Sequence, residues 1–328
     1  MQRVLDPAQI EAFAQRTIPR IRLPDPAKVF SDRAARLLKL SEGHSVGDYL
    51  RLMAAVAKAQ QDALEKLLAS STVGPASAQD QQRMQQAREH GMPLLEASGW
   101  PRDRAWRSVL LELCDAIAAA PGFPGGVAGT CRRIRELSAE ALEEQAHLLL
   151  NTAGHGIDAQ AAPFIMAALQ VYWTRMVCTL SHDVVAEHVG NVDVPGVCPV
   201  CGTLPVASVV RAEKAYQGYR YLHCSLCATE WHLVRVKCSH CESTEGVHYY
   251  SIEAGSIEAG STEGGSSAVR AETCDSCKTY RKICYQEHDM AVEPVADDLG
   301  SLALDLLMSE AGFHRGSGNP LLWQSAEP

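Results

Sequence analysis

Eight of the twelve cysteines stand in four Cys-x-x-Cys pairs within 80 residues of one another. The pairs are Cys198/Cys201, Cys224/Cys227, Cys238/Cys241 and Cys274/Cys277. A Cys-x-x-Cys turn directs two thiolates at one centre, and two such turns supply the four sulfurs of a tetrahedral metal site. One pair alone would be a weak indication. Four pairs in one region predict that these eight residues bind two metal ions.

The spacing of the pairs indicates which of them share a metal. Twenty-two residues separate Cys201 from Cys224, close to the roughly 15–20 typical of four-cysteine ribbons. Between Cys241 and Cys274 lie 32 residues, of which 15 form a tandem repeat (SIEAG, SIEAG, STEGG) at 251–265, so 17 remain. The favoured arrangement is therefore sequential, with the first two pairs at one metal and the last two at the other. An interleaved arrangement, first pair with third and second with fourth, stays open.

The identity of the metal is less constrained than its ligands. Tetrahedra of thiolates suit both zinc and iron. A divalent ion with four thiolates carries a formal charge of −2, in a region (195–328) that already has 10 Lys and Arg against 17 Asp and Glu. Nucleic-acid binding draws on clustered cations, so this charge disfavours a nucleic-acid-binding zinc ribbon.

Other roles for these thiols and their neighbours fit less well. A thioredoxin-like dithiol needs one Cys-x-x-Cys at a helix N-terminus in a βαβ setting, which four pairs on hairpins do not resemble. A purely structural role for both metals remains a rival. We expect Cys284 to be a buried strand residue rather than a spare ligand. The remaining cysteines are expected in the helical core, and four nearby histidines are not expected to be ligands: Cys114, Cys131, Cys178, His223, His232, His240 and His248.

Composition narrows the class of protein further. The 328-residue chain has a formal net charge of −9, 46% apolar and 21% charged residues, as soluble globular proteins do. No secretory signal or membrane span is predicted, and clustered thiols are typical of the reducing cytoplasm. The chain has no G-x-S-x-G motif, P-loop, H-E-x-x-H motif or convincing dinucleotide fingerprint, so nothing predicts an enzyme.

Apolar periodicity predicts an α+β protein of several domains. Residues 1–194 are predicted to be helical throughout, with helices at roughly 103–120, 131–151 and 160–189. Short strands are predicted at 219–223, 230–236 and 247–251, a mobile loop over the repeat, and a closing helix at 297–311. The domains expected are a helical one, two small four-cysteine β modules of zinc-ribbon type, and a C-terminal helix with its tail: 1–194, 195–235, 236–295 and 296–328.

Several segments resemble the family of formate dehydrogenase accessory proteins called FdhE. They include CPVCGTLPVASVV at 198–210, GYRYLHCSLCATEWHLVRVKCSHC at 218–241 and ETCDSCKTYRK at 272–282. The helical segment 29–60 and the C-terminal AGFHRGSGNPLL at 311–322 also match, so the resemblance covers nearly the whole chain. Its specificity lies in the ordered set of four cysteine pairs with WHLVRVKC between them.

The resemblance implies a function that the spacing alone does not. It implies a cytoplasmic, non-enzymatic maturation factor that binds the catalytic subunit of formate dehydrogenase and carries iron in two rubredoxin-like modules with the eight paired cysteines as ligands. The repeat at 251–265 departs from the family pattern. The rival interpretations are a rubredoxin-type electron-transfer protein and a structural zinc-ribbon adaptor. Neither membrane insertion nor nucleic-acid binding is expected, and homo-oligomerisation stays open.

Overall fold

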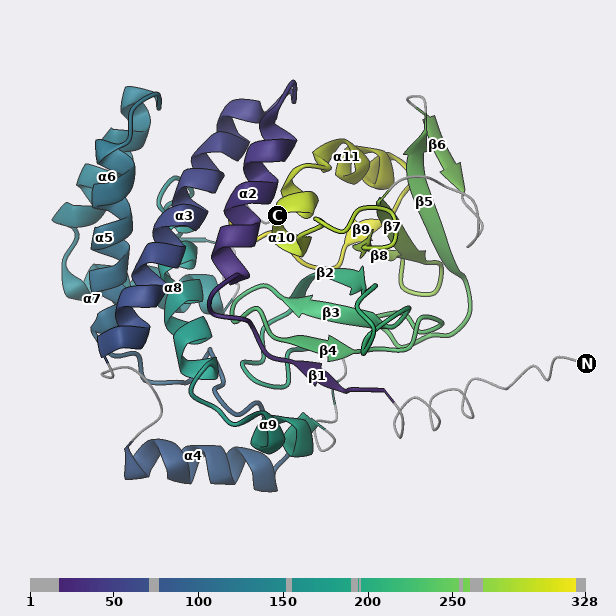
Figure 1. Cartoon of the computed structure of the whole chain (residues 1–328), viewed down its shortest axis with the longest axis horizontal. Coiled ribbons are helices and arrows are strands. Elements are labelled where there is room, and N and C mark those ends of the chain that lie inside the picture. The colour runs from purple at the N-terminus through teal and green to yellow at the C-terminus, as the bar shows by residue number, and fades with distance from the viewer. Residues whose placement is uncertain are drawn as a thin grey trace, which may run out of the picture.

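Helices fill the N-terminal part of the chain and strands fill most of the C-terminal part (Figure 1). The computed structural model describes residues 18–70, 77–151, 155–189, 194, 196–253, 256–259 and 268–322. The helices are α2 (Val29–Ser41), α3 (Gly47–Ser70), α4 (Ala78–Glu89), α5 (Ala105–Ala119), α6 (Gly125–Glu136), α7 (Ala139–Leu150), α8 (Ala162–Val177), α9 (His182–Val189), α10 (Pro294–Leu299) and α11 (Leu302–Glu310). This order confirms the predicted α+β class.

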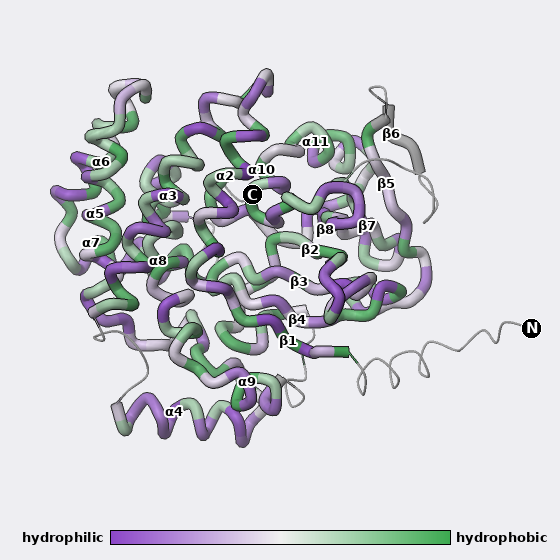
Figure 2. The backbone as a smooth tube through the Cα atoms, viewed as in Figure 1, coloured by the Kyte–Doolittle hydropathy of each residue, from purple (hydrophilic) through white to green (hydrophobic). Residues whose placement is uncertain are grey.

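Helix α8 is the central helix of the N-terminal part. Every residue in it except Met166 is buried. Its Gln170 side chain is paired, since it accepts from the Gln60 side chain at 2.9 Å and from Arg33 at 3.3 Å. A helix buried on all sides must be apolar on all sides, which explains its unusually apolar sequence. At the other extreme, α4 has no buried residue, and Figure 2 shows it mainly hydrophilic.

No helix in the described residues has the length and apolar character that crossing a membrane requires.

Several predicted helices are interrupted in the structure. The segment predicted at 131–151 forms α6 and α7, because Ser138 caps α7 by accepting a hydrogen bond from the N–H of Ala141 at 3.2 Å. The segment 160–189 forms α8 and α9, and the closing segment forms α10 and α11 on either side of Gly300. Apolar periodicity continues through these short breaks, so the prediction from sequence joined neighbouring helices into one.

The strands in the described part of the chain form one nine-stranded sheet. They are β1 (Ile21–Arg22), β2 (Pro205–Val210), β3 (Arg220–Cys224), β4 (Glu230–His232), β5 (Val247–Glu253), β6 (Ser256–Ala259), β7 (Val269–Cys274), β8 (Thr279–Tyr285) and β9 (His314–Arg315). Their order is β1-β4-β3-β2-β8-β7-β5-β6, with β9 pairing β8. The pairs β2–β8 and β8–β9 are parallel and the others are antiparallel.

The two four-cysteine regions therefore share a sheet, joined where β2 pairs with β8 through Ser208↔Ile283 to Val210↔Tyr285. Buried side chains also cross this seam: Arg220 of β3 pairs with Glu272 of β7 at 2.6 Å. The N-terminal part contributes too, because β1 pairs with β4, which corrects the expectation that residues 1–194 are helical throughout. The four-domain division of the chain stays a prediction.

Part of the tandem repeat is a hairpin rather than the expected loop. Residues 251–253 end β5, and 256–259 form β6, with Ser251 opposite Glu258 and Ile252 opposite Ile257. The Ser-Ile-Glu segments of the first two copies thus pair with each other. Residues 254–255 and 260–267 lie outside the described part of the chain.

The main hydrophobic core runs from the helices into the first four-cysteine region. It contains residues of α2, α3, α5 and α8 together with Cys198, Cys201, Cys224 and Cys227. Buried ion pairs add to this junction, since Arg33 and Arg36 of α2 pair with Glu293 at 3.0 Å and Asp297 at 2.6 Å. The second region has a small core of its own with α11, made of Ala271, Tyr280, Leu304, Met308 and Phe313.

Candidate metal centres

All four Cys-x-x-Cys pairs lie on the same kind of tight turn. The residue after each second cysteine has a positive φ, and a serine or threonine follows it. In three turns the N–H of the first cysteine donates to the carbonyl of that serine or threonine at 2.8–2.9 Å, and in the fourth Cys274 pairs with Thr279 in the β7–β8 ladder. The left-handed residues are Gly202 (φ 78°), Ala228 (56°), Glu242 (62°) and Lys278 (54°).

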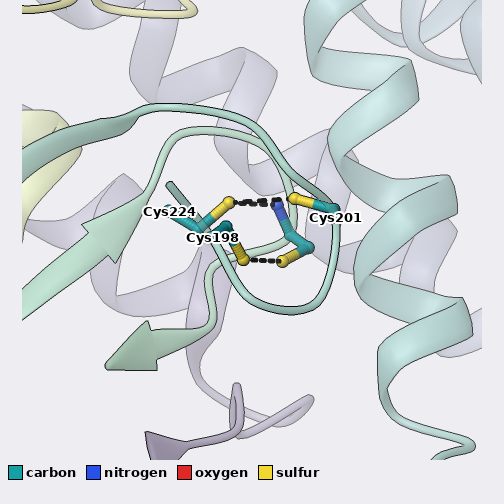
Figure 3. A group of neighbouring side chains, drawn as sticks. Cys198, Cys201 and Cys224 are labelled. Atoms are coloured by element: carbon teal, nitrogen blue, oxygen red, sulfur yellow. Dashed lines mark hydrogen bonds between the residues drawn. The ribbon is translucent and has the colours of Figure 1, made fainter. Parts of the chain in front are cut away.

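Turns one and two bring four thiols together in site 1, formed by Cys198, Cys201, Cys224 and Cys227. Figure 3 shows the side chains of the first three pointing toward one another from adjacent loops. The Sγ atoms of Cys198 and Cys227 are 3.6 Å apart, and those of Cys201 and Cys224 are 3.3 Å apart. None of the four cysteines is more than 1% exposed, so site 1 is closed to solvent.

Turns three and four form site 2, with Cys238, Cys241, Cys274 and Cys277. The Sγ atoms of Cys238 and Cys277 are 3.8 Å apart, and those of Cys241 and Cys274 are 3.7 Å apart. Cys241 is exposed and Cys277 is partly exposed, whereas the other two are buried. The structure therefore groups the pairs in sequence order and not in the interleaved order.

The sulfur positions suit a tetrahedral thiolate centre. A metal with sulfur bonds of about 2.3 Å has sulfur–sulfur edges of about 3.8 Å. The site 2 distances match that edge, and those of site 1 are a few tenths of an ångström shorter. Within each site all four sulfurs lie within 4.8 Å of one another. Each site could therefore hold one zinc or iron ion with four thiolate ligands.

The helical region holds both turns of site 1 in place. The N–H groups of Leu95 and Ala97 donate to the carbonyls of Val200 (2.7 Å) and Cys201 (2.9 Å). On the second turn the carbonyl of Ser225 accepts from Gln170 of α8 at 2.7 Å. These contacts place site 1 between the sheet and the central helix.

Ionic contacts around the two sites differ in burial. Beside site 1, the carboxylate of Glu230 accepts from Arg22 (2.8 Å), Arg211 (3.0 Å) and His223 (2.9 Å), and its side chain is 4% exposed. Beside site 2, Asp275 pairs with His248 at 3.0 Å and Lys278 at 3.1 Å, and all three side chains are about half exposed. Burial reduces the solvent screening of the ion pairs of Glu230, whereas solvent screens the exposed ion pairs of Asp275.

One sulfur in each site favours the thiolate form. Burial alone would raise the pKa of Cys224, but hydrogen bonds from the thiols of Cys198, Cys201 and Cys227 lower it well below its ordinary value. Burial would likewise raise the pKa of Cys274, yet the N–H groups of Cys277 and Ser276 lower it to about 7. Burial raises the pKa of Cys198 well above its ordinary value. Binding a metal in site 1 would therefore release protons.

The neighbouring residues behave largely as the sequence predicts. Cys284 is fully buried in β8, and Cys114 and Cys131 are buried in the helical core, whereas Cys178 at the end of α8 is only half-buried. Among the described residues, no histidine joins a group of metal-ligand side chains. His223 instead donates to the Glu230 carboxylate, and His232 packs edge-on against Tyr221.

Two threonines at site 1 were not predicted from the sequence. The Thr203 hydroxyl is 3.1 Å from the sulfurs of both Cys201 and Cys224, and the Thr229 hydroxyl is 3.2 Å from the sulfur of Cys227. The signal was available, since all four turns read Cys-x-x-Cys-x-Ser/Thr.

Comparison with known proteins connects this architecture with one family. The family models described as FdhE N-terminal, FdhE central domain and FdhE C-terminal domain match residues 18–190, 197–235 and 236–322. The chain is 39% identical to "Protein FdhE homolog" of Cronobacter sakazakii and 37% identical to "Protein FdhE" of Salmonella paratyphi A. Each match covers 98% of this chain and 97% of the relative.

A solved structure supports the same connection. The crystal structure of the FdhE protein from Pseudomonas aeruginosa is similar to this chain with a TM-score of 0.76 and 37% sequence identity. The match covers 93% of this chain and 99% of the other. The likeness thus includes the helical region, the shared sheet and the segments that carry the cysteine turns.

Proposed function

The chain belongs to the FdhE family, and from this we propose that it is a cytoplasmic accessory protein that matures formate dehydrogenase by binding its catalytic subunit. The observation that carries the proposal is the pair of four-cysteine sites in a chain that matches the family along nearly its whole length. We assign no enzymatic turnover to it.

The eight paired cysteines are the proposed ligands of two metal ions, iron or zinc, and the family resemblance favours iron. Bound metal would supply either a one-electron centre or a fixed crosslink between two turns. In site 1 the crosslink would join two turns that the helical region also holds. The residues of the chain would bind and orient the ion, and in site 1 they would also exclude water from it.

The partner role is tested in cells that lack this gene. Complementation with the wild-type chain should restore formate dehydrogenase activity, and the catalytic subunit should co-purify with it. A chain with Cys198→Ser and Cys201→Ser should fail on both counts. Full activity in cells that lack the gene would refute the maturation role. Full activity with the double variant would remove site 1 from it.

An electron-transfer role is a second candidate, favoured by the exposure of Cys241 at site 2. Metal analysis and a visible spectrum of protein purified without oxygen decide between the two metals. Iron bands that bleach reversibly on reduction would support electron transfer. Two zinc ions and a colourless protein would make both sites structural and place the function in the partner surface.

A further inference from the structure

The hydroxyl group that follows each Cys-x-x-Cys turn has different contacts in the two sites. In site 1, Thr203 lies 3.1 Å from two sulfurs and Thr229 lies 3.2 Å from a third, Cys227. In site 2, Ser243 accepts from the N–H of Glu245 at 3.1 Å and from the Ser276 hydroxyl at 3.1 Å, and Thr279 donates to the carbonyl of Cys277 at 3.4 Å. Equivalent sequence positions therefore contact sulfur in site 1 and other oxygen or nitrogen atoms in site 2.

The local backbone accounts for the difference between Ser243 of site 2 and the two threonines of site 1. Two residues after Ser243, the N–H of Glu245 donates a hydrogen bond to the serine hydroxyl oxygen. Two residues after Thr203 stands Pro205, which has no N–H to offer. Two residues after Thr229 stands Trp231, which pairs with Leu222 in the β3–β4 ladder. The backbone after these threonines therefore does not hydrogen-bond their hydroxyl oxygens as Glu245 does that of Ser243, and the hydroxyls contact sulfur instead.

The direction of these hydrogen bonds follows from the chemistry of a loaded site. A metal-bound thiolate has no proton to donate, so the threonine must be the donor. A hydrogen bond to an ionised group is about twice as strong as one between neutral groups, and the closed surroundings of site 1 strengthen it further. Each such bond withdraws electron density from the sulfur that accepts it.

We propose that Thr203 and Thr229 are positioning residues that hydrogen-bond the thiolates of site 1, so that site 1 holds its metal more tightly than site 2 does. The inference rests on the proposed metal binding by the eight cysteines. For an iron ion the same bonds favour the ferrous state, of formal charge −2 with four thiolates, over the ferric state of −1. The two threonines therefore raise the reduction potential of site 1 above the value that it would have without them.

The test uses the full chain loaded with Co²⁺, whose sulfur-to-metal charge-transfer bands report on the thiolates. Thr203→Val and Thr229→Val keep the side-chain shape and remove the hydroxyl, whereas Thr203→Ser and Thr229→Ser keep it. Ser243→Ala and Thr279→Val are the matched controls at site 2. Competition with a chelator measures the affinity of each site, and circular dichroism checks the fold.

The valine variants should move about half of the charge-transfer intensity to longer wavelength and weaken one of the two cobalt sites by about 10-fold or more, the usual effect of losing an outer-shell partner. The serine variants should restore both readouts, and the site 2 controls should change neither. Unchanged bands and affinity in the folded valine variants would overturn the inference. Wild-type protein that binds no cobalt would instead overturn the proposed metal sites and this inference with them.

Discussion

Sites 1 and 2 are built from the same turn but lie in opposite surroundings. Each site is formed by two Cys-x-x-Cys turns, and in every turn the second cysteine is followed by a left-handed residue and then by a serine or threonine. Site 1 is part of the main hydrophobic core and is closed to solvent, whereas site 2 exposes Cys241 at the surface. Local sequence thus determines which thiols meet. The elements packed around the turns determine how accessible and how stable each site is.

Because the surroundings differ, metal binding has different consequences for folding at the two sites. The turns of site 1 are bonded to the 95–97 segment and to α8, so a metal there would hold the sheet against the helices. Site 2 lies among strands that pack on α11 and the small core around Phe313. A metal there would stabilise its own hairpins and leave the helical region unaffected.

The largest effect is expected when two ligands are removed from each site in turn. The variant with Cys198→Ser and Cys201→Ser should bind one metal ion fewer. Its helices should no longer unfold in one cooperative transition. The reason is that structural zinc contributes about 10–16 kcal/mol in small domains, as much as the whole stability of most proteins. Metal content and thermal unfolding followed by far-ultraviolet circular dichroism measure both effects.

The matched variant, Cys274→Ser with Cys277→Ser, should also lose one metal but keep the helical transition near the wild-type temperature. Equal losses of helical stability in the two variants would show that the burial of site 1 does not connect it with the helices.

A smaller effect is expected at the buried ion cluster beside site 1. Glu230→Gln leaves Arg22 and Arg211 without their shared carboxylate, and breaking such a buried pair costs about 3–5 kcal/mol of unfolding free energy. Asp275→Asn, beside site 2, should not change the unfolding midpoint, because its partners are exposed. Urea unfolding of both variants at neutral pH gives the comparison.

Acid should reduce the Glu230 effect. Burial alone would raise the pKa of Glu230, but Arg211, His223 and Arg22 lower it well below its ordinary value. A carboxyl group whose pKa is lower in the folded than in the unfolded chain stabilises fully above the unfolded value, about 4.3, and progressively less below it. The gap between wild type and Glu230→Gln should therefore narrow as the pH falls below about 4. A gap that stays constant as the pH falls below about 4 would contradict the assignment.

The smallest perturbation leaves the sequence unchanged. Excess chelator added to the metal-loaded protein should remove one ion quickly, through the exposed Cys241, and the other slowly. Reaching site 1 requires local opening, and an opening that costs about 1.4 kcal/mol already slows removal tenfold. The site 2 double variant should lack the fast phase. A single phase in the wild type would show that the two sites are equally accessible.

The sequence was sufficient for the local parts of this structure. Two thiols three residues apart on a turn necessarily lie close together, and subtracting the 251–265 repeat made the second spacing resemble the first, so the sequential grouping could be predicted. Strands near 220–224, 230–232 and 247–253 were predicted from their β-branched and aromatic residues.

The parts that depend on distant residues could not be predicted. The parallel pairing of β2 with β8 joins segments about 75 residues apart, and β1 is only two residues long, too short for any periodic signal. The exposure of Cys241 and the burial of Cys201 depend on which elements pack over each turn, which spacing does not encode. Metal identity has no sequence signal in an all-cysteine site.

The ion pairs between α2 and α10 make the order of synthesis matter. Arg33 and Arg36 leave the ribosome some 260 residues before Glu293 and Asp297, the carboxylates that neutralise them. Until those residues emerge, α2 has two guanidinium groups that cannot be buried without partners. A chain that ends before these carboxylates therefore lacks the ion pairs that hold α2 against α10.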